Sequence, residues 1–234
     1  MYTALGKVYD LFYENDAGKR ADVYARYLPL GEGVDLGCGT GALTLELYKR
    51  GYRIAGADVS SEMLAQAAER ALRAGARIRF TRGSAYDPLS AHPLDFVLAA
   101  NDVCNYVPRL DKAFSNICGA LRAGGVFAFD ISSAYKLTQI LAGNTFSETK
   151  ENVTYVWQNC RKGNKLLIDF TVFTPEGELY RKSDETQTQY IRTEQEIADA
   201  LVKAGFTDVR AYAFGKKDPP AQDTPRILFT ARKP

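Results

Sequence analysis

Short apolar runs alternate with helical stretches in the first half of the chain. Strands are predicted at residues 34–36, 53–57, 77–81, 95–100 and 126–131. Between the strands, apolar residues recur three and four positions apart, as on a helix with one buried face, at residues 42–50, 63–74 and 110–121. Strands that alternate with helices usually form a parallel sheet through right-handed crossovers, so we expect such a sheet here.

The alternation of strands and helices ends after residue 131. Further strand-like segments follow at residues 153–157, 166–174 and 179–191. In the last of these, Glu185, Gln187 and Gln189 occupy alternate positions, which is typical of a half-exposed antiparallel strand. A capping box at residues 193–196 then opens a helix, and two more strands are predicted at residues 209–214 and 226–231.

These elements predict an α/β fold. We expect a seven-stranded, mostly parallel sheet with helices on both faces, plus a small antiparallel β insertion before the last helix and two strands. The main domain would comprise residues 1–132 and 191–234, with the insertion at residues 133–190. The insertion would cover the substrate, make a homodimer contact through its edge, or do both.

Two helices are predicted before the first strand, at residues 2–13 and 19–28. They form either a cap over the sheet or a lid over a ligand. The lid hypothesis depends on Tyr9, Tyr13 and Tyr24, because tyrosine is amphipathic enough to line a polar pocket.

The charges of the chain nearly cancel, with 30 basic and 28 acidic residues among 234 and a net charge of +2. No run of five like charges occurs, so we expect no nucleic-acid or anionic-membrane partner. Because we find neither a signal-peptide pattern nor an apolar run of about 18 residues, we expect a cytoplasmic location. Four scattered cysteines and one histidine give no metal-ligand spacing, so we expect no metal site and reduced, mostly buried thiols.

A glycine-rich turn follows the first strand. Its spacing, Gly37-x-Gly39-x-x-Ala42, satisfies a dinucleotide-binding fingerprint, and Asp58 lies about 20 residues further on, where it could hold a ribose. Asp35 argues against a dinucleotide, because a pyrophosphate would meet a like charge, whereas the sulfonium and ammonium of S-adenosylmethionine would be attracted. Two plainer alternatives remain open: Asp35 only accepts hydrogen bonds from loop amides, and Asp58 caps the next helix.

Three segments resemble motifs of the class I, Rossmann-like S-adenosylmethionine-dependent methyltransferases. They lie at residues 34–41, 58–64 and 121–127, in the family's order and spacing. Later segments, at residues 129–131, 143–146 and 155–157, are similar to the YqeM-like group of bacterial methyltransferases, which carries a β-rich insertion. The resemblance therefore extends over nearly the whole chain, and it implies S-adenosylmethionine as the cofactor.

The resemblance also implies which residues contact the cofactor. Residues 35–41 would hold its methionine portion and Asp58 its ribose, while Val59 and Met63 would flank the adenine. Many members have an acidic residue near position 84 for the adenine amino group, and here Ser84 or the local backbone would take that role. The complete predicted set is Tyr9, Asp35, Gly37, Cys38, Gly39, Gly41, Asp58, Val59, Met63, Ser84, Ala85 and Asn101.

Asn101 would lie near the transferred methyl group, at the end of the fourth strand. The residues predicted to face the substrate are Tyr13, Asp102, Asn105, Tyr106 and Trp157. In-line methyl transfer mainly requires alignment and exclusion of water, and a base helps only when the nucleophile is protonated. Asp102 and Tyr106 are the predicted catalytic residues, whereas His92 is expected in a solvated loop.

The balanced charge favours a small-molecule acceptor that is methylated at oxygen or nitrogen. Residues 101–104 lack the Pro-Pro-aromatic signature of enzymes that methylate exocyclic amines of nucleobases, and Cys104 does not resemble the nucleophile of cytosine-C5 methyltransferases. A nucleic-acid methyltransferase is therefore a weaker hypothesis. Two others stay open: an NAD-dependent oxidoreductase, and a module that binds S-adenosylmethionine without catalysis.

Overall fold

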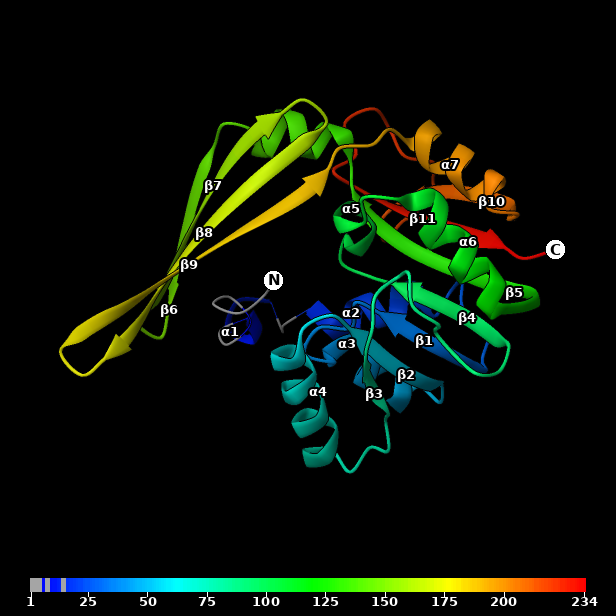
Figure 1. Cartoon of the computed structure of the whole chain (residues 1–234), viewed down its shortest axis with the longest axis horizontal. Coiled ribbons are helices and arrows are strands. Elements are labelled where there is room, and N and C mark those ends of the chain that lie inside the picture. Colours follow the sequence, from blue (N-terminus) through cyan, green and yellow to red (C-terminus); the bar gives the residue numbers. More distant parts are fainter. Residues whose placement is uncertain (1–5, 7–8, 14–15) are drawn as a thin grey trace.

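The protein is described by a computed structural model that covers residue 6, residues 9–13 and residues 16–234 (Figure 1). The first part of the helix predicted at residues 2–13 lies outside the described residues, and so does the side chain of Tyr13. The remainder of that helix is α1 (Tyr9–Tyr13).

The larger of two sheets has seven strands in the order β10-β11-β5-β4-β1-β2-β3. β11 runs antiparallel to β5 and β10, and the other neighbouring pairs are parallel, so the mostly parallel sheet predicted from the sequence is confirmed. Its strands are β1 (Glu32–Leu36), β2 (Arg53–Asp58), β3 (Phe80–Arg82), β4 (Leu94–Ala99), β5 (Leu121–Ser132), β10 (Thr207–Ala213) and β11 (Arg226–Arg232).

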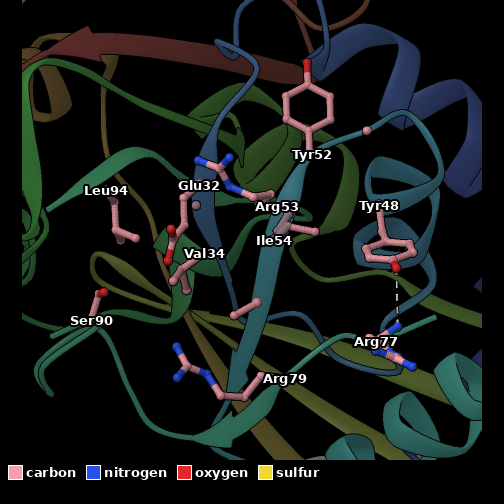
Figure 2. Close-up of a pocket in the computed structure, with 13 residues that line it drawn as sticks. Glu32, Val34, Tyr48, Tyr52, Arg53, Ile54, Arg77, Arg79, Ser90 and Leu94 are labelled. Carbon is pink, nitrogen blue, oxygen red and sulfur yellow. Dashed lines mark hydrogen bonds between the residues drawn. The ribbon is translucent and has the colours of Figure 1, made fainter. Parts of the chain in front are cut away.

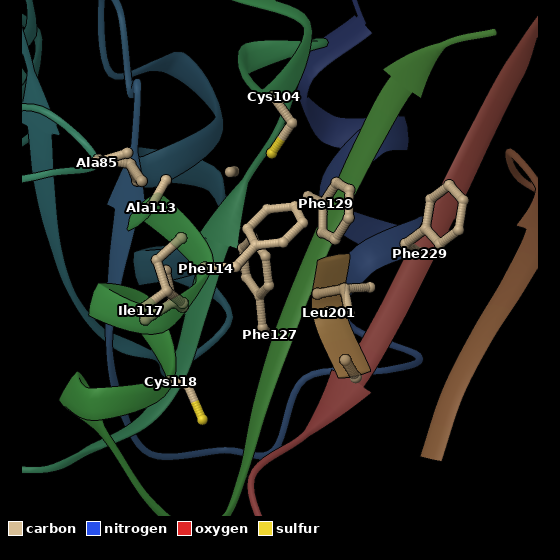
Figure 3. Packing of buried hydrophobic residues seen from close by; sticks show 14 of the residues in the cluster. Ala85, Cys104, Ala113, Phe114, Ile117, Cys118, Phe127, Phe129, Leu201 and Phe229 are labelled. Atoms are coloured by element: carbon tan, nitrogen blue, oxygen red, sulfur yellow. The ribbon is translucent and has the colours of Figure 1, made fainter. Parts of the chain in front are cut away.

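Helices cover both faces of this sheet, as predicted. Side chains alternate along β5, so Phe127 and Phe129 pack against one helical layer while Val126 and Ala128 pack against the other. In Figure 3, Phe114 lies beside Phe127 and Phe129, with ring centroids 5.5 Å from each. The helices around the sheet are α2 (Ala17–Tyr24), α3 (Ala42–Lys49), α4 (Ser61–Arg73), α6 (Leu110–Ala120) and α7 (Glu194–Lys203).

The insertion forms a separate four-stranded antiparallel sheet in the order β6-β7-β8-β9, a long twisted ribbon that extends away from the main sheet (Figure 1). Its strands are β6 (Thr145–Lys150), β7 (Val153–Lys162), β8 (Lys165–Glu176) and β9 (Leu179–Tyr190). A π-helix, η3 (Lys136–Leu141), connects it to β5. Leu137 of this helix and Phe12 of α1 pack on the inner face of the ribbon.

Some boundaries differ from those predicted. β3 begins only at Phe80, because it pairs with β2 alone at the edge of the sheet. β6, η3 and α5 (Val103–Tyr106) were not predicted, since β6 has few apolar residues and the two helical segments are too short to show a period. The capping box is confirmed, with Thr193 and Glu196 each bonded to the other's backbone.

A buried carboxylate, Asp130, joins distant parts of this fold. It is 0 % exposed and accepts hydrogen bonds from the hydroxyl of Tyr24 in α2 and from Arg226 in β11. It also accepts from the backbone amides of Asn101, at 2.7 Å, and Asp102, at 3.3 Å. Burial by itself would raise the pKa of Asp130, but the charges of Arg226 and Arg20 and these hydrogen bonds outweigh it, so the pKa is lowered.

We expect Asp130→Asn to destabilise the protein by roughly 3–5 kcal/mol, because it leaves the Arg226 charge buried without its partner. Urea unfolding at neutral pH measures the loss. The control is Asp208→Asn, which removes exposed ion pairs with Arg210, at 2.8 Å, and with Arg232, at 3.6 Å, and should cost less than about 1 kcal/mol. Equal losses in the two variants would contradict the role given to Asp130.

Candidate active site

The glycine-rich turn lies between β1 and α3, where its backbone is tied to the neighbouring strand. The amides of Gly37 and Cys38 donate to the Ala57 carbonyl at 2.7 and 3.1 Å. Gly37 has a φ of 73°, and a Cβ there would lie 2.3 Å from the side chain of Val103, so only glycine fits. Around Gly39, with a φ of 54°, a Cβ would meet nothing within 4 Å, which leaves space beside the turn for a ligand.

Asp35 lies beneath this turn and is 1 % exposed. Its carboxylate accepts a 2.6 Å hydrogen bond from the Thr44 hydroxyl, and among the described residues no ion pair joins it to a cation. The plainer alternative was that Asp35 only accepts hydrogen bonds from loop amides. In the described residues its carboxylate instead accepts from the Thr44 side chain. Burial raises the pKa of Asp35 from its ordinary value of 3.8 to about 7. A cationic ligand group beside Asp35 would stabilise the ionised carboxylate and offset the cost of its burial.

Asp58, at the end of β2, is also buried. Its two oxygens accept 2.9 Å hydrogen bonds from the amides of Gly39 and Ser60. The helix cap is Ser60, whose hydroxyl accepts from the Met63 amide, so Asp58 itself does not cap α4. Burial raises the pKa of Asp58, although its backbone hydrogen bonds act to lower it. Because a carboxylate has about four acceptor positions, capacity remains for ribose hydroxyls.

The residues predicted around the adenine differ in what they offer. Val59 is 42 % exposed, an open apolar surface, whereas Met63 is a buried residue in the first turn of α4. The Ser84 hydroxyl and amide donate to Asp87 Oδ2 at 2.7 and 2.8 Å, and its carbonyl accepts from the Asp87 amide at 3.1 Å, so Ser84 is occupied within its own loop. The Cys38 thiol packs on Gly56, where a Cβ would lie 2.8 Å from its sulfur, so Cys38 can offer only backbone atoms.

The turn after β4 holds the next group of predicted residues. Asn101 and Asp102 have φ values of 59° and 55°, a left-handed conformation that asparagine and aspartate tolerate best and that costs free energy. The hydrogen bonds from their amides to Asp130 stabilise it. The Asp102 carboxylate accepts from Ser132 Oγ at 3.0 Å and from Gln189 Nε2 at 2.9 Å.

Several residues of this group escaped the sequence analysis: Asp130, Ser132, Lys136, Gln189 and Arg226. Arg226 lies 3.9 Å from Asp102, and Lys136 Nζ donates to Ser132 Oγ at 3.3 Å. Burial is the main cause that lowers the pKa of Lys136. Only Asp130 could have been noticed in the sequence, because it is a charged residue within the apolar run of β5. The other four residues reach the site through contacts that exist only in the folded chain.

The remaining predicted residues are more dispersed. Asn105 is buried, and its amide bonds the backbone of Ser132 and the carbonyl of Tyr190, so its polar atoms are occupied in holding β5 and β9 together. Trp157 stacks on Tyr155 in the insertion, with ring centroids 4.9 Å apart. Tyr9 and Tyr106 are half-buried. Tyr24 is fully buried beneath Asp130, so it does not line a pocket.

The helix α1 is bound to the glycine turn. Thr40 donates to Asp10 at 2.6 Å, and Arg70 of α4 donates to the same carboxylate at 2.5 Å. The helix therefore lies at the site, where a lid is predicted.

A cavity of about 720 Å³ lies elsewhere, at the start of β1, β2 and β4 (Figure 2). Glu32, Arg53 and Leu94, the first residues of those strands, line it together with Arg77 and Arg79. It contains none of the predicted site residues. The carboxyl ends of parallel strands, where ligands bind in open α/β sheets, instead hold the glycine turn and the turn after β4.

The described part of the chain contains no group of three or more His, Cys, Asp or Glu that could hold a metal ion, and no helix long and apolar enough to cross a membrane. Three of the four cysteines are buried and Cys160 is exposed, all of them as free thiols. His92 is exposed in its loop, as predicted.

Known proteins resemble this chain in sequence and structure. The family described as "Methyltransferase domain" matches residues 34–125. A Bacillus subtilis (strain 168) protein named "Putative methyltransferase YqeM" is 27% identical over 206 residues, which cover 86% of this chain and 83% of that protein.

Two solved structures extend the comparison. The crystal structure of an S-adenosylmethionine-dependent methyltransferase from Clostridium acetobutylicum ATCC 824 has a TM-score of 0.86 and 26% identity, and the match covers 99% of this chain and 98% of that one. The sugar N-methyltransferase KedS8 from Streptoalloteichus sp ATCC 53650 has a TM-score of 0.77 and 20% identity, over 96% and 92% of the two chains. At that identity KedS8 shows the fold alone.

The raised pKa of Asp35 predicts a pH-dependent cost in stability. Because the folded state holds the proton up to about pH 7 and the unfolded state releases it near 3.8, stability should fall as the pH rises between these values. Asp35→Asn removes this dependence, so at pH 8 the variant should exceed the wild type by on the order of 2–4 kcal/mol, with little difference at pH 4. Urea unfolding of both proteins at several pH values tests this, and a constant difference across the range would refute it.

Proposed function

Because the chain is a class I S-adenosylmethionine-dependent methyltransferase, we propose that it methylates a small molecule at oxygen or nitrogen by in-line transfer. The observation that carries the proposal is the pair of buried carboxylates, Asp35 and Asp58, at the glycine turn. Two carboxyl groups at this point disfavour a pyrophosphate, whose charge would oppose their ionisation, and favour a cationic cofactor, whose charge would stabilise their ionised forms. S-adenosylmethionine, when bound, supplies an electrophilic methyl group on a sulfonium.

The residues present fit this cofactor. In the proposal, Asp35 and the turn at residues 37–41 hold its methionine portion, and Asp58 accepts both ribose hydroxyls. Exposed Val59 covers one face of the adenine, Met63 supports that wall from beneath, and the backbone amide of Ala85, next to Ser84, bonds its edge. Tyr9, at the start of α1, closes the site against water.

The turn after β4 then positions the acceptor. Asn101 lies at the transferred methyl, and Asp102 is fixed beside it by hydrogen bonds from Ser132 and Gln189. Asp102 is the proposed base for a protonated nucleophile, with Tyr106 as the second candidate. Orientation by this rigid turn contributes independently of any proton transfer.

Three features support a small-molecule acceptor. The charges of the chain nearly cancel, which provides little attraction for nucleic acid. The insertion adds an aromatic cover that includes Trp157, and β9 of the insertion contacts Asp102. KedS8, which shares the fold, is named as a sugar N-methyltransferase. Cytoplasmic location and a homodimer through the edge of the insertion are further proposals.

Isothermal titration should show micromolar binding of S-adenosylmethionine and no comparable binding of NAD. Asp58→Ala should weaken that binding by more than about 100-fold, since it removes two charge-assisted hydrogen bonds. The control is Asp22→Ala, which removes an exposed ion pair with Arg50 and should bind normally. Thermal unfolding of each variant verifies that it is folded.

Each alternative has a distinct outcome. Preferential binding of NAD would replace the proposal with an oxidoreductase. Binding of S-adenosylmethionine without transfer to any acceptor in a broad panel would indicate a non-catalytic module. Retention on heparin at low salt, with transfer to nucleic acid, would indicate a nucleic-acid methyltransferase.

A further inference from the structure

The inner face of the insertion carries buried polar side chains along its edge strand, β9. Gln187 and Gln189 are only 2 % and 3 % exposed. Their register partners on β8, Ile168 and Leu166, are buried on the same face. On β7, Asn159 pairs with Ile168 and is buried as well. This face is therefore apolar along β8 but amide-bearing on both sides of it.

Three side-chain oxygens on this face have no hydrogen-bond partner: Asn159 Oδ1, Gln187 Oε1 and Gln189 Oε1. They are all the buried side-chain oxygens in the described part of the chain that lack one. Native proteins leave few buried polar atoms in this state, because an unmade buried hydrogen bond costs free energy. Because all three lie on one face, they indicate a ligand that donates hydrogen bonds to these oxygens.

The orientation of both glutamine amides is fixed. Gln189 Nε2 donates to Asp102 at 2.9 Å, and Gln187 Nε2 donates to Glu185 at 2.9 Å. Turning either amide over would place a carbonyl oxygen against a carboxylate. The carbonyl oxygens therefore stay available as acceptors, and Gln189 connects this row directly to Asp102 at the proposed site of methyl transfer.

A ligand that completes these atoms must bring hydrogen-bond donors. Among the described residues, the carboxylates that contact these glutamines are Asp102 and Glu185, while Lys136 donates to Ser132 and Arg226 is paired with Asp130. A carboxylate or phosphate would meet two carboxylates and three carbonyl oxygens. An ammonium or amine with hydroxyl neighbours would instead find acceptors on each side.

We propose that the methyl acceptor is a basic amine rich in N–H and O–H donors, recognised by Asn159, Gln187 and Gln189 together with Asp102. This deepens the proposed function and rests on it. The bound ammonium first loses a proton to Asp102. The amine lone pair then forms the N–C bond while the C–S bond breaks with its electrons staying on sulfur. The products are the N-methylammonium and S-adenosylhomocysteine. Since the three oxygens are closed to solvent, the acceptor reaches them only when the residues that cover them move.

The class of acceptor can be tested without its identity. The protein is incubated with methyl-labelled S-adenosylmethionine and a bacterial small-molecule extract divided by ion exchange into basic, acidic and neutral fractions. Label should enter the basic fraction. With an aminohexose as probe, Asp102→Asn should shift the rise of kcat/KM to higher pH, toward the pKa of the amine, because without the base only amine that is already unprotonated reacts.

Matched variants test the recognising residues. Gln187→Leu and Gln189→Leu should each raise the KM for the acceptor in the basic fraction by about 10-fold or more. The Kd of S-adenosylmethionine should stay unchanged. Gln187 does not contact Asp102, so its variant separates recognition from support of the base. The control is Gln158→Leu on the exposed face of β7, which should leave both constants unchanged.

The outcomes separate this inference from the function on which it rests. Label that enters only the acidic or neutral fraction, or unchanged KM values in both glutamine variants, would overturn the amine assignment while the methyltransferase proposal stands. Failure to bind S-adenosylmethionine, or binding without label in any fraction, would overturn the proposed function and the amine assignment with it.

Discussion

The site depends on one buried carboxylate, Asp130, because that group stabilises a turn that would otherwise be strained. Two consecutive left-handed residues, Asn101 and Asp102, are unfavourable alone, and their amides are held by Asp130. The same carboxylate pairs with the charge of Arg226 and accepts a hydrogen bond from the Tyr24 hydroxyl. A helix, two strands and a turn therefore converge on it. The position of the proposed base is therefore set by the core, not by a flexible loop.

Around this centre the free protein retains several polar groups that packing alone does not favour. Asp35 is buried without a cation among the described residues, and Gln187 and Gln189 each leave an oxygen unpaired. Each lowers stability before a ligand is bound, and each has a natural complement in the proposed cofactor or acceptor. Violations of packing rules that lie close to a proposed binding site are typical of functional sites.

How much could be predicted from the sequence depends on the range of the interactions. The parallel strands, their helices and the glycine turn follow from local patterns, and Asp35 and Asp58 lie where those patterns indicate. β6 and η3 were not predicted, because one has few apolar residues and the other is too short. Asp130, Arg226 and Gln189 could not be placed, since their contacts join residues up to 106 positions apart. For Asn105 the residue was noticed, but backbone contacts occupy its amide.

This difference in range has a consequence for specificity. The cofactor side is built from a strand, a turn and a helix that are adjacent in sequence, so it forms wherever that unit forms. The proposed acceptor side depends on the contact between Gln189 and Asp102, 87 positions apart, and on an insertion with its own apolar core. Substitutions on the inner face of β9 can change which hydrogen-bond donors of the acceptor molecule find a partner. They leave the glycine turn unchanged. A single scaffold can therefore keep one methyl donor while the insertion changes the acceptor.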